Sequence, residues 1–92
     1  DVYRVRQGWI VKFDLAGISP KDIALEARGN QLVLSGVRRD MLVAEDPVHY
    51  SLEISYSHFR RTIPFEFDLS TAKISSDYKD GMLVVRIQLE DR

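Results

Sequence analysis

The chain has 92 residues, a formal net charge of −1 and no cysteine. This length suits one small domain, and the charge argues against electrostatic binding to nucleic acid or to an anionic membrane. Without cysteine there is no disulfide, thiolate zinc site or thiol nucleophile, which fits a cytoplasmic setting. No apolar run approaches the roughly 20 residues of a membrane-spanning helix.

Alternating apolar residues predict strands from the first residues onward. A short alternating segment, 2–6, precedes a clearer one at 9–17. In the second segment, every other side chain from Trp9 to Leu15 is apolar, and the alternate face carries Lys12 and Asp14, with Ile10 as the one exception. This alternation is typical of a half-buried strand.

The next segment is ambiguous between helix and strand. Ser19 followed by proline looks like a helix start, and residues 23–28 are good helix formers. The same residues also alternate with period two, and the Gly29-Asn30 pair after them is turn chemistry between two strands. We therefore predict a single turn at 19–22 and a strand at 23–28.

The second half of the chain continues the strand pattern. We read residues 40–56 as a loop with a short strand near 49–52, and we predict further strands at 31–39, 56–63, 73–79 and 82–89. Leu32 and Leu34 face inward in the strand at 31–39. In the last strand one face carries Leu83, Val85, Ile87 and Leu89, and the Asp80-Gly81 pair turns the chain before it. Seven or eight short strands separated by Gly, Pro and Asn turns predict an all-β, immunoglobulin-like β-sandwich. Such a sandwich has edge strands, which must be paired, covered or charged.

No residue pattern indicates catalysis. His49 and His58 match no metal-binding spacing, and the chain has no Gly-x-Ser-x-Gly segment. The arginine pairs are too short and too diluted by acids to be a nucleic-acid patch. We therefore expect no catalytic site, no metal site and no cofactor, and a protein that is not an enzyme but works through its surfaces.

One strand contains an unexpected charge. In "SHFRRTIPFEF", residues 57–67, alternation places Phe59, Arg61 and Ile63 on one face. The apolar residues on either side of Arg61 indicate that this face is buried. A buried unpaired charge is costly, so the sequence raises the question of what compensates Arg61.

Three stretches together resemble the α-crystallin domain of the bacterial-type small heat-shock proteins. They are "FDLAGISPKDIALEARGNQLVLSGVRR", "EISYSHFRRTIPF" and "ISSDYKDGMLVVRIQL", in the family's order and spacing. The chain departs from the family pattern at several positions: Ala16 stands where proline is usual, Val37 where glutamate is usual, and Gln88-Leu89 where Pro-Lys is usual. Ile54 and Ser57 are further departures.

The resemblance implies an ATP-independent molecular chaperone, a holdase of the stress response that binds partly unfolded proteins and prevents their aggregation. It implies a homodimer that builds a larger oligomer in the full-length protein, with no nucleic acid or membrane partner. Residues 1–92 would then be one α-crystallin domain cut from a longer chain, without its N-terminal arm and C-terminal tail. The alternative is a p23/CS-type co-chaperone or an adaptor module that binds a specific folded partner.

The resemblance also implies a groove between two edge strands. In the family, a tail segment or a client docks between the strands that match 23–28 and 73–79. Carried over by position, the lining would be Leu25, Ala27, Ile74 and Ser76. The alternative is that Leu25 and Ile74 are ordinary core residues, and the sequence leaves both readings open.

The family's dimer implies an interface in the second half of the chain. The long loop would reach across and add its short strand to the partner's sheet; the alternative is a solvated hairpin tip. Arg61 matches the family's characteristic arginine, and we expect it to pair with a carboxylate near the subunit interface, Glu53 being one candidate. The predicted interface residues are therefore Arg61, His49, Tyr50, Ser51, Leu52 and Glu53.

Overall fold

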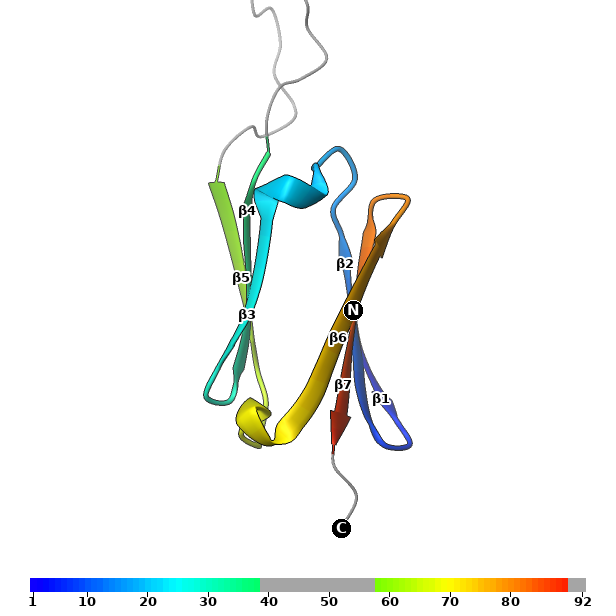
Figure 1. Cartoon of the computed structure of the whole chain (residues 1–92), viewed down its shortest axis with the longest axis vertical. Coiled ribbons are helices and arrows are strands. Elements are labelled where there is room, and N and C mark those ends of the chain that lie inside the picture. The colour runs from blue at the N-terminus through cyan, green and yellow to red at the C-terminus, as the bar shows by residue number, and fades with distance from the viewer. Residues whose placement is uncertain (39–57, 90–92) are drawn as a thin grey trace, which may run out of the picture.

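The computed structural model describes residues 1–38 and 58–89, which form two antiparallel β-sheets facing each other (Figure 1). One sheet has the strand order β1-β2-β7-β6 and the other β3-β4-β5. The strands are β1 (Val2–Val5), β2 (Gly8–Asp14), β3 (Ile23–Arg28), β4 (Gln31–Val37), β5 (His58–Pro64), β6 (Ala72–Lys79) and β7 (Met82–Leu89). The predicted all-β sandwich is confirmed, with seven strands in the described residues. The further strand predicted near 49–52 lies outside them.

The ambiguous segment is resolved as predicted. A single 3-10 turn, η1 (Pro20–Asp22), is followed at once by β3. Ser19 is extended, and its side chain makes no capping hydrogen bond. Because β3 pairs along its whole length with β4, backbone hydrogen bonds to a neighbouring strand outweigh the helix propensity of its residues.

Two tight hairpins have the turn chemistry that their sequences predict. Gly29, between β3 and β4, has a φ of 58°. Between β6 and β7, Asp80 and Gly81 have φ values of 53° and 79°. Positive φ at both central residues makes the β6–β7 connection a type I′ turn. In the β3–β4 connection only the first central residue, Gly29, has positive φ, which is the pattern of a type II′ turn. The twist of both turn types matches that of the flanking strands.

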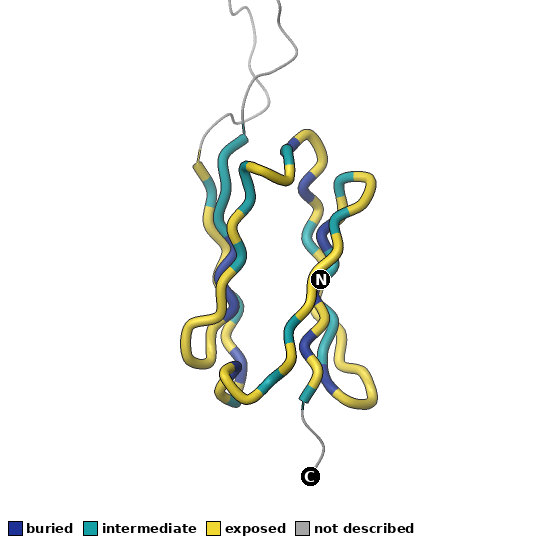
Figure 2. The backbone as a smooth tube through the Cα atoms, viewed as in Figure 1, coloured by how far each residue is buried: buried dark blue, intermediate teal, exposed yellow. Residues whose placement is uncertain are grey.

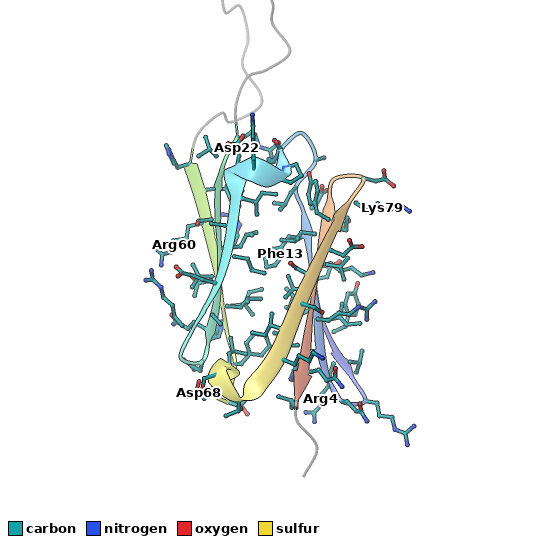
Figure 3. The ribbon with its side chains drawn as sticks, in the orientation of Figure 1. Arg4, Phe13, Asp22, Arg60, Asp68 and Lys79 are labelled. Carbon is teal, nitrogen blue, oxygen red and sulfur yellow. The ribbon has the colours of Figure 1, made fainter. Side chains whose placement is uncertain are left out.

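The core lies between the sheets and is built from alternate residues of the inner strands β2, β4 and β7, together with residues of the connecting segments (Figure 2). Val11 on β2 is directly opposite Val85 on β7, and both are fully buried. Phe13 points into the space between the sheets (Figure 3), where it packs against the core. The core residues are Val11, Leu15, Ile18, Leu32, Leu34, Phe65, Leu69, Leu83, Val85 and Ile87. The predicted inward faces of 9–15, 31–39 and 82–89 are thereby confirmed.

One element was not predicted from the sequence. A second 3-10 turn, η2 (Leu69–Thr71), links the end of β5 to β6 and buries Leu69. Asp68 caps it: the backbone N–H of Ser70 donates to Oδ1 of Asp68 over 2.9 Å. This bond, with a second from the Ser70 side chain, holds the pKa of Asp68 below its usual 3.8.

Candidate interaction surface at the open strand edges

The sheet order leaves four strand edges without a neighbouring strand among the described residues. They are β1 and β6 of the four-stranded sheet, and β3 and β5 of the three-stranded sheet. Figure 1 looks onto the side bounded by β3 and β6, so β1 and β5 lie on the far side. An unpaired edge exposes backbone N–H and C=O groups that can pair with another chain, so these two sides are the candidate interaction surfaces.

The structure brings the four predicted groove residues to the inner faces of β3 and β6. Their cross-strand partners are all core residues: Leu25 is opposite Leu34, Ala27 opposite Leu32, Ile74 opposite Ile87 and Ser76 opposite Val85. Within this set, the two larger side chains are half-buried and pack against the core, whereas Ala27 and Ser76 are exposed. The set is therefore partly core and partly open surface, and its role in binding stays a prediction.

Hydrogen bonds lie at both ends of the β3–β6 side. At one end, the hydroxyl of Tyr78 on β6 lies 3.0 Å from the carbonyl oxygen of Leu15 and 2.7 Å from that of Ile18. At the other end, the N–H of Leu69 in η2 donates to the carbonyl of Gly29 over 2.8 Å. The first contact ties β6 to the segment that leads from β2 to η1, and the second ties η2 to the turn between β3 and β4.

A second surface, on the far side, was not predicted from the sequence. It is a groove of about 510 Å³ with one wall from β1 and β2, another from the end of β5 and the residues after it, and the end of β7 beneath. The lining residues are Val2, Arg4, Trp9, Ile63, Pro64, Phe65, Glu66, Phe67 and Leu89. We refer to these residues as the far-side groove.

Aromatic side chains hold the far-side groove together. The rings of Trp9 and Phe65 meet edge to face with centroids 5.7 Å apart, and those of Phe65 and Phe67 are 5.3 Å apart. The guanidinium of Arg4 lies 5.4 Å from the Trp9 ring centroid, within the range of a cation–π interaction. In the sequence, only the Phe-x-Phe spacing of Phe65 and Phe67 points to this aromatic cluster. Their position next to Trp9 depends on the fold.

Arg61 occupies the inner-face position that alternation predicts, directly opposite the buried Leu34. In the single chain it is nevertheless exposed, and its Nη1 donates to the carbonyl of Arg60 over 3.1 Å. An exposed ion pair elsewhere, on β3, joins Arg28 to Glu26 over 2.9 Å. The remaining predicted interface residues, His49, Tyr50, Ser51, Leu52 and Glu53, lie outside the described residues, so the interface stays a prediction.

Within the part of the chain that the structure describes, no three His, Cys, Asp or Glu residues cluster to hold a metal ion. In the same residues, no helix is long and apolar enough to cross a membrane.

Comparison with known proteins gives close agreement in fold. HSP18.5 from E. histolytica is 26% identical, with a TM-score of 0.76, over 97% of this chain and 84% of that one. A small heat-shock protein from Xylella fastidiosa superimposes with a TM-score of 0.79 at 21% identity, over 100% of this chain and 84% of that one. At 21% identity, the match to the Xylella fastidiosa protein is evidence for the fold alone.

Two bacterial proteins are similar to this chain in sequence. The 18 kDa heat shock protein of Streptomyces albus G is 28% identical over all of this chain and 64% of its own length. The 18 kDa antigen 1 of Mycobacterium avium is 29% identical over all of this chain and 61% of its own length. The chain thus spans less than two thirds of the length of these relatives.

The family comparison covers the chain from end to end. The sequence profile of the Hsp20/alpha crystallin family matches residues 1–92, and these residues contain all three stretches that carry the resemblance. The chain therefore belongs to the Hsp20/alpha crystallin family.

Proposed function

We propose that this domain is the binding module of an ATP-independent holdase, a chaperone that captures partly unfolded proteins and keeps them from aggregating. The observation that carries the proposal is the pair of open edges β3 and β6, whose inner faces present half-buried apolar side chains. Membership of the Hsp20/alpha crystallin family supports it, and favours it over a p23/CS-type co-chaperone.

The physical basis of capture is simple. A destabilised protein exposes apolar segments and unpaired strands, and an open sheet edge can accept an extended segment as an additional strand. Backbone hydrogen bonds then supply affinity, while inner-face residues such as Leu25 and Ile74 supply apolar contact. Binding to the non-native state shifts the equilibrium by mass action, so no nucleotide or other cofactor is needed.

The assembly belongs to the proposal as well. We propose a homodimer, larger oligomers in the whole protein, and a cytoplasmic setting with no nucleic acid or membrane partner. The open edge of β1 is available to a strand from a second copy. Arg61, exposed in the single chain, would be covered at such an interface, together with His49–Glu53.

A model-client assay tests the proposed function. A heat-labile enzyme is warmed without ATP, alone or with the protein, and aggregation is followed by light scattering. A holdase lowers the scattering in proportion to its concentration, both as the 92-residue domain and, more strongly, as the full-length protein. If neither lowers it while a specific folded partner is bound, the adaptor alternative is correct instead.

A further inference from the structure

Apolar side chains are exposed on the outer face of the four-stranded sheet, the face turned away from the core. Within residues 1–38 and 58–89, four large apolar residues are 39–46% exposed, and three of them lie on this face: Tyr3, Val5 and Met82. An antiparallel sheet with one face on the core is normally polar on the other, and a large contiguous apolar patch on a protein surface usually marks an interaction site. The outer face is therefore a candidate interface.

These residues belong to one continuous stripe. Tyr3 on β1 is directly opposite Ile10 on β2, which lies diagonally from Val84 on β7; both of these neighbours are half-buried. Val5 extends the stripe to the hairpin between β1 and β2, and Met82 extends it to the hairpin between β6 and β7, at the opposite end of the sheet (Figure 1). Paired and diagonal side chains on one face are close enough to touch. We refer to Tyr3, Val5, Ile10, Met82 and Val84 as the outer stripe.

The charged side chains beside the outer stripe are divided by sign. One flank, on β1 and β2, has two acids and one base, which are Asp1, Asp14 and Lys12. The other flank, on β6 and β7, has three bases and one acid, which are Lys73, Lys79, Arg86 and Asp77. The ammonium of Lys12 lies 5.3 Å from the centroid of the Tyr3 ring, so the base of the first flank folds over the stripe. Arg6 and Asp80 lie in the turns beyond its two ends. The outer stripe thus separates an acidic flank from a basic one.

This division of charge fits a second copy of the same chain. Two sheets pack face to face about 10 Å apart, and a two-fold axis between them gives both copies the same contact surface. When that axis runs along the outer stripe, the two stripes lie on each other and the acidic flank of one copy faces the basic flank of the other. With ordinary strand spacings, Asp1 of each copy then lies beside Arg86 of the other. Opposite charges that face each other favour this orientation.

We propose that the outer stripe is an interface at which two dimers of this chain pack face to face, so that dimers assemble into the larger oligomer. This inference rests on the homodimer and oligomer of the proposed function and names the surface that joins the dimers. The stripe faces away from the β3–β6 side and is distinct from the open edge of β1. The contact therefore leaves both the client surface and the strand pairing of the dimer in place.

Sedimentation velocity of the 92-residue chain, over a range of concentrations, tests the interface. Val84→Lys should raise the concentration at which half of the dimers have associated by about tenfold or more, because its ammonium would be desolvated without a partner. Met82→Lys should act in the same direction, and Met82 is exposed enough, at 39%, that the fold is kept. The matched control is Ala24→Lys, on the exposed outer face of the other sheet opposite Ser35, which should leave association unchanged.

Charge reversal tests the orientation of the two copies. Arg86→Glu and Asp1→Lys should each weaken the association of dimers, because like charges then face each other. The double variant restores opposite charges and should associate more strongly than either single variant. Added salt should reduce these differences, since the charged flanks lie at the rim of the contact. Circular dichroism checks that every variant keeps the fold.

Three results would overturn the inference. One is equal association in Val84→Lys, Met82→Lys and Ala24→Lys; another is a double variant that associates no better than Arg86→Glu. The third is a domain whose dimers do not associate while Val84→Lys still shrinks the full-length assembly, which would mean that another segment of the longer protein covers the stripe. The model-client assay keeps the two proposals apart. Dimers that suppress aggregation without associating refute only the interface, and associating dimers that do not suppress it refute only the holdase.

Discussion

Tyr78 connects parts of the chain that are distant in sequence. Its hydroxyl, on edge strand β6, bonds to the carbonyls of Leu15 and Ile18, in the segment that crosses from the four-stranded sheet to η1. The hydroxyl has a single proton, so the two carbonyls share one donor. The bond is part-buried, where a polar group left without a partner costs more than at the surface.

Tyr78→Phe should lower the free energy of unfolding by about 1–2 kcal/mol, because two part-buried carbonyls lose their donor. Urea or thermal unfolding measures the change. The control is Tyr3→Phe: Tyr3 is 46% exposed and its hydroxyl bonds only to the exposed Asp1, so a change of less than about 0.5 kcal/mol is expected there. Equal losses in the two variants would show that the crossover bond is unimportant.

Asp68 links stability to acid pH. The hydrogen bonds from Ser70 lower the folded-state pKa of Asp68. The ionised carboxylate therefore adds to the free energy of unfolding above the unfolded-state pKa, and this addition is lost as pH falls through the lower, folded-state pKa. The melting temperature of Asp68→Ala should therefore lie below that of the unchanged protein at neutral pH. The gap should close as pH falls below about 3.8. A gap that is independent of pH would contradict this account.

At the scale of the element, the two faces of an edge strand have different neighbours: the inner face lies over the core and the outer face lies toward solvent. Ser75 and Ser76 are adjacent on β6 and both exposed. Ser76 is opposite the buried Val85 on the inner face, whereas Ser75 is opposite Arg86 on the outer face. The same chemical change at these two positions therefore separates a binding effect from an effect on the strand itself.

Ser76→Glu should weaken binding of apolar peptides or clients at the β3–β6 side by about tenfold, because it introduces a carboxylate that must be desolvated against Ile74 and Leu25. Ser75→Glu should leave binding unchanged, since it faces Arg86 and solvent. Aggregation of a model client and unfolding by urea are measured for both. Should the two variants suppress aggregation equally well, the groove assigned to this side is wrong.

At the scale of the whole molecule, Arg61 and Arg60 are adjacent residues of one strand whose side chains lie on opposite faces, so comparing them tests the subunit interface. Arg61 faces inward opposite Leu34, and Arg60 faces outward opposite Ser35; Figure 3 shows Arg60 pointing away from the sandwich. Both are exposed in the single chain. Only the inward-facing arginine lies where a second subunit would cover it together with the apolar inner face.

Arg61→Ala should weaken the dimer or enlarge the assembly, since losing one partner of a buried ion pair costs about 3–5 kcal/mol. Arg60→Ala should change little, because an exposed arginine contributes about 1 kcal/mol or less. Native mass by light scattering, with melting temperature, decides between them. An unchanged mass and melting temperature for Arg61→Ala would remove the interface role from this residue.

The sequence by itself determined the strands, their turns and their inward faces. Period-two alternation identified Leu32 and Leu34 as inward-facing, and the Gly29-Asn30 and Asp80-Gly81 pairs identified the hairpins; these are local properties that neighbouring residues decide. The short 3-10 turn after Asp68 was missed, because its capping bond spans only two residues and leaves no periodic pattern.

The family resemblance named 23–28 and 73–79 as edge strands, but only the tertiary structure showed that β1 and β5 are the other two edges. β2 pairs with β7 from the other end of the chain, and this pairing leaves β1 and β6 outermost. Alternation alone therefore could not show that Arg61 would be exposed on an inner face, or that Phe65 and Phe67 would meet Trp9 beside Arg4. Such contacts depend on pairings between residues far apart in sequence, whose free energy comes from burial in the folded state and not from any local preference.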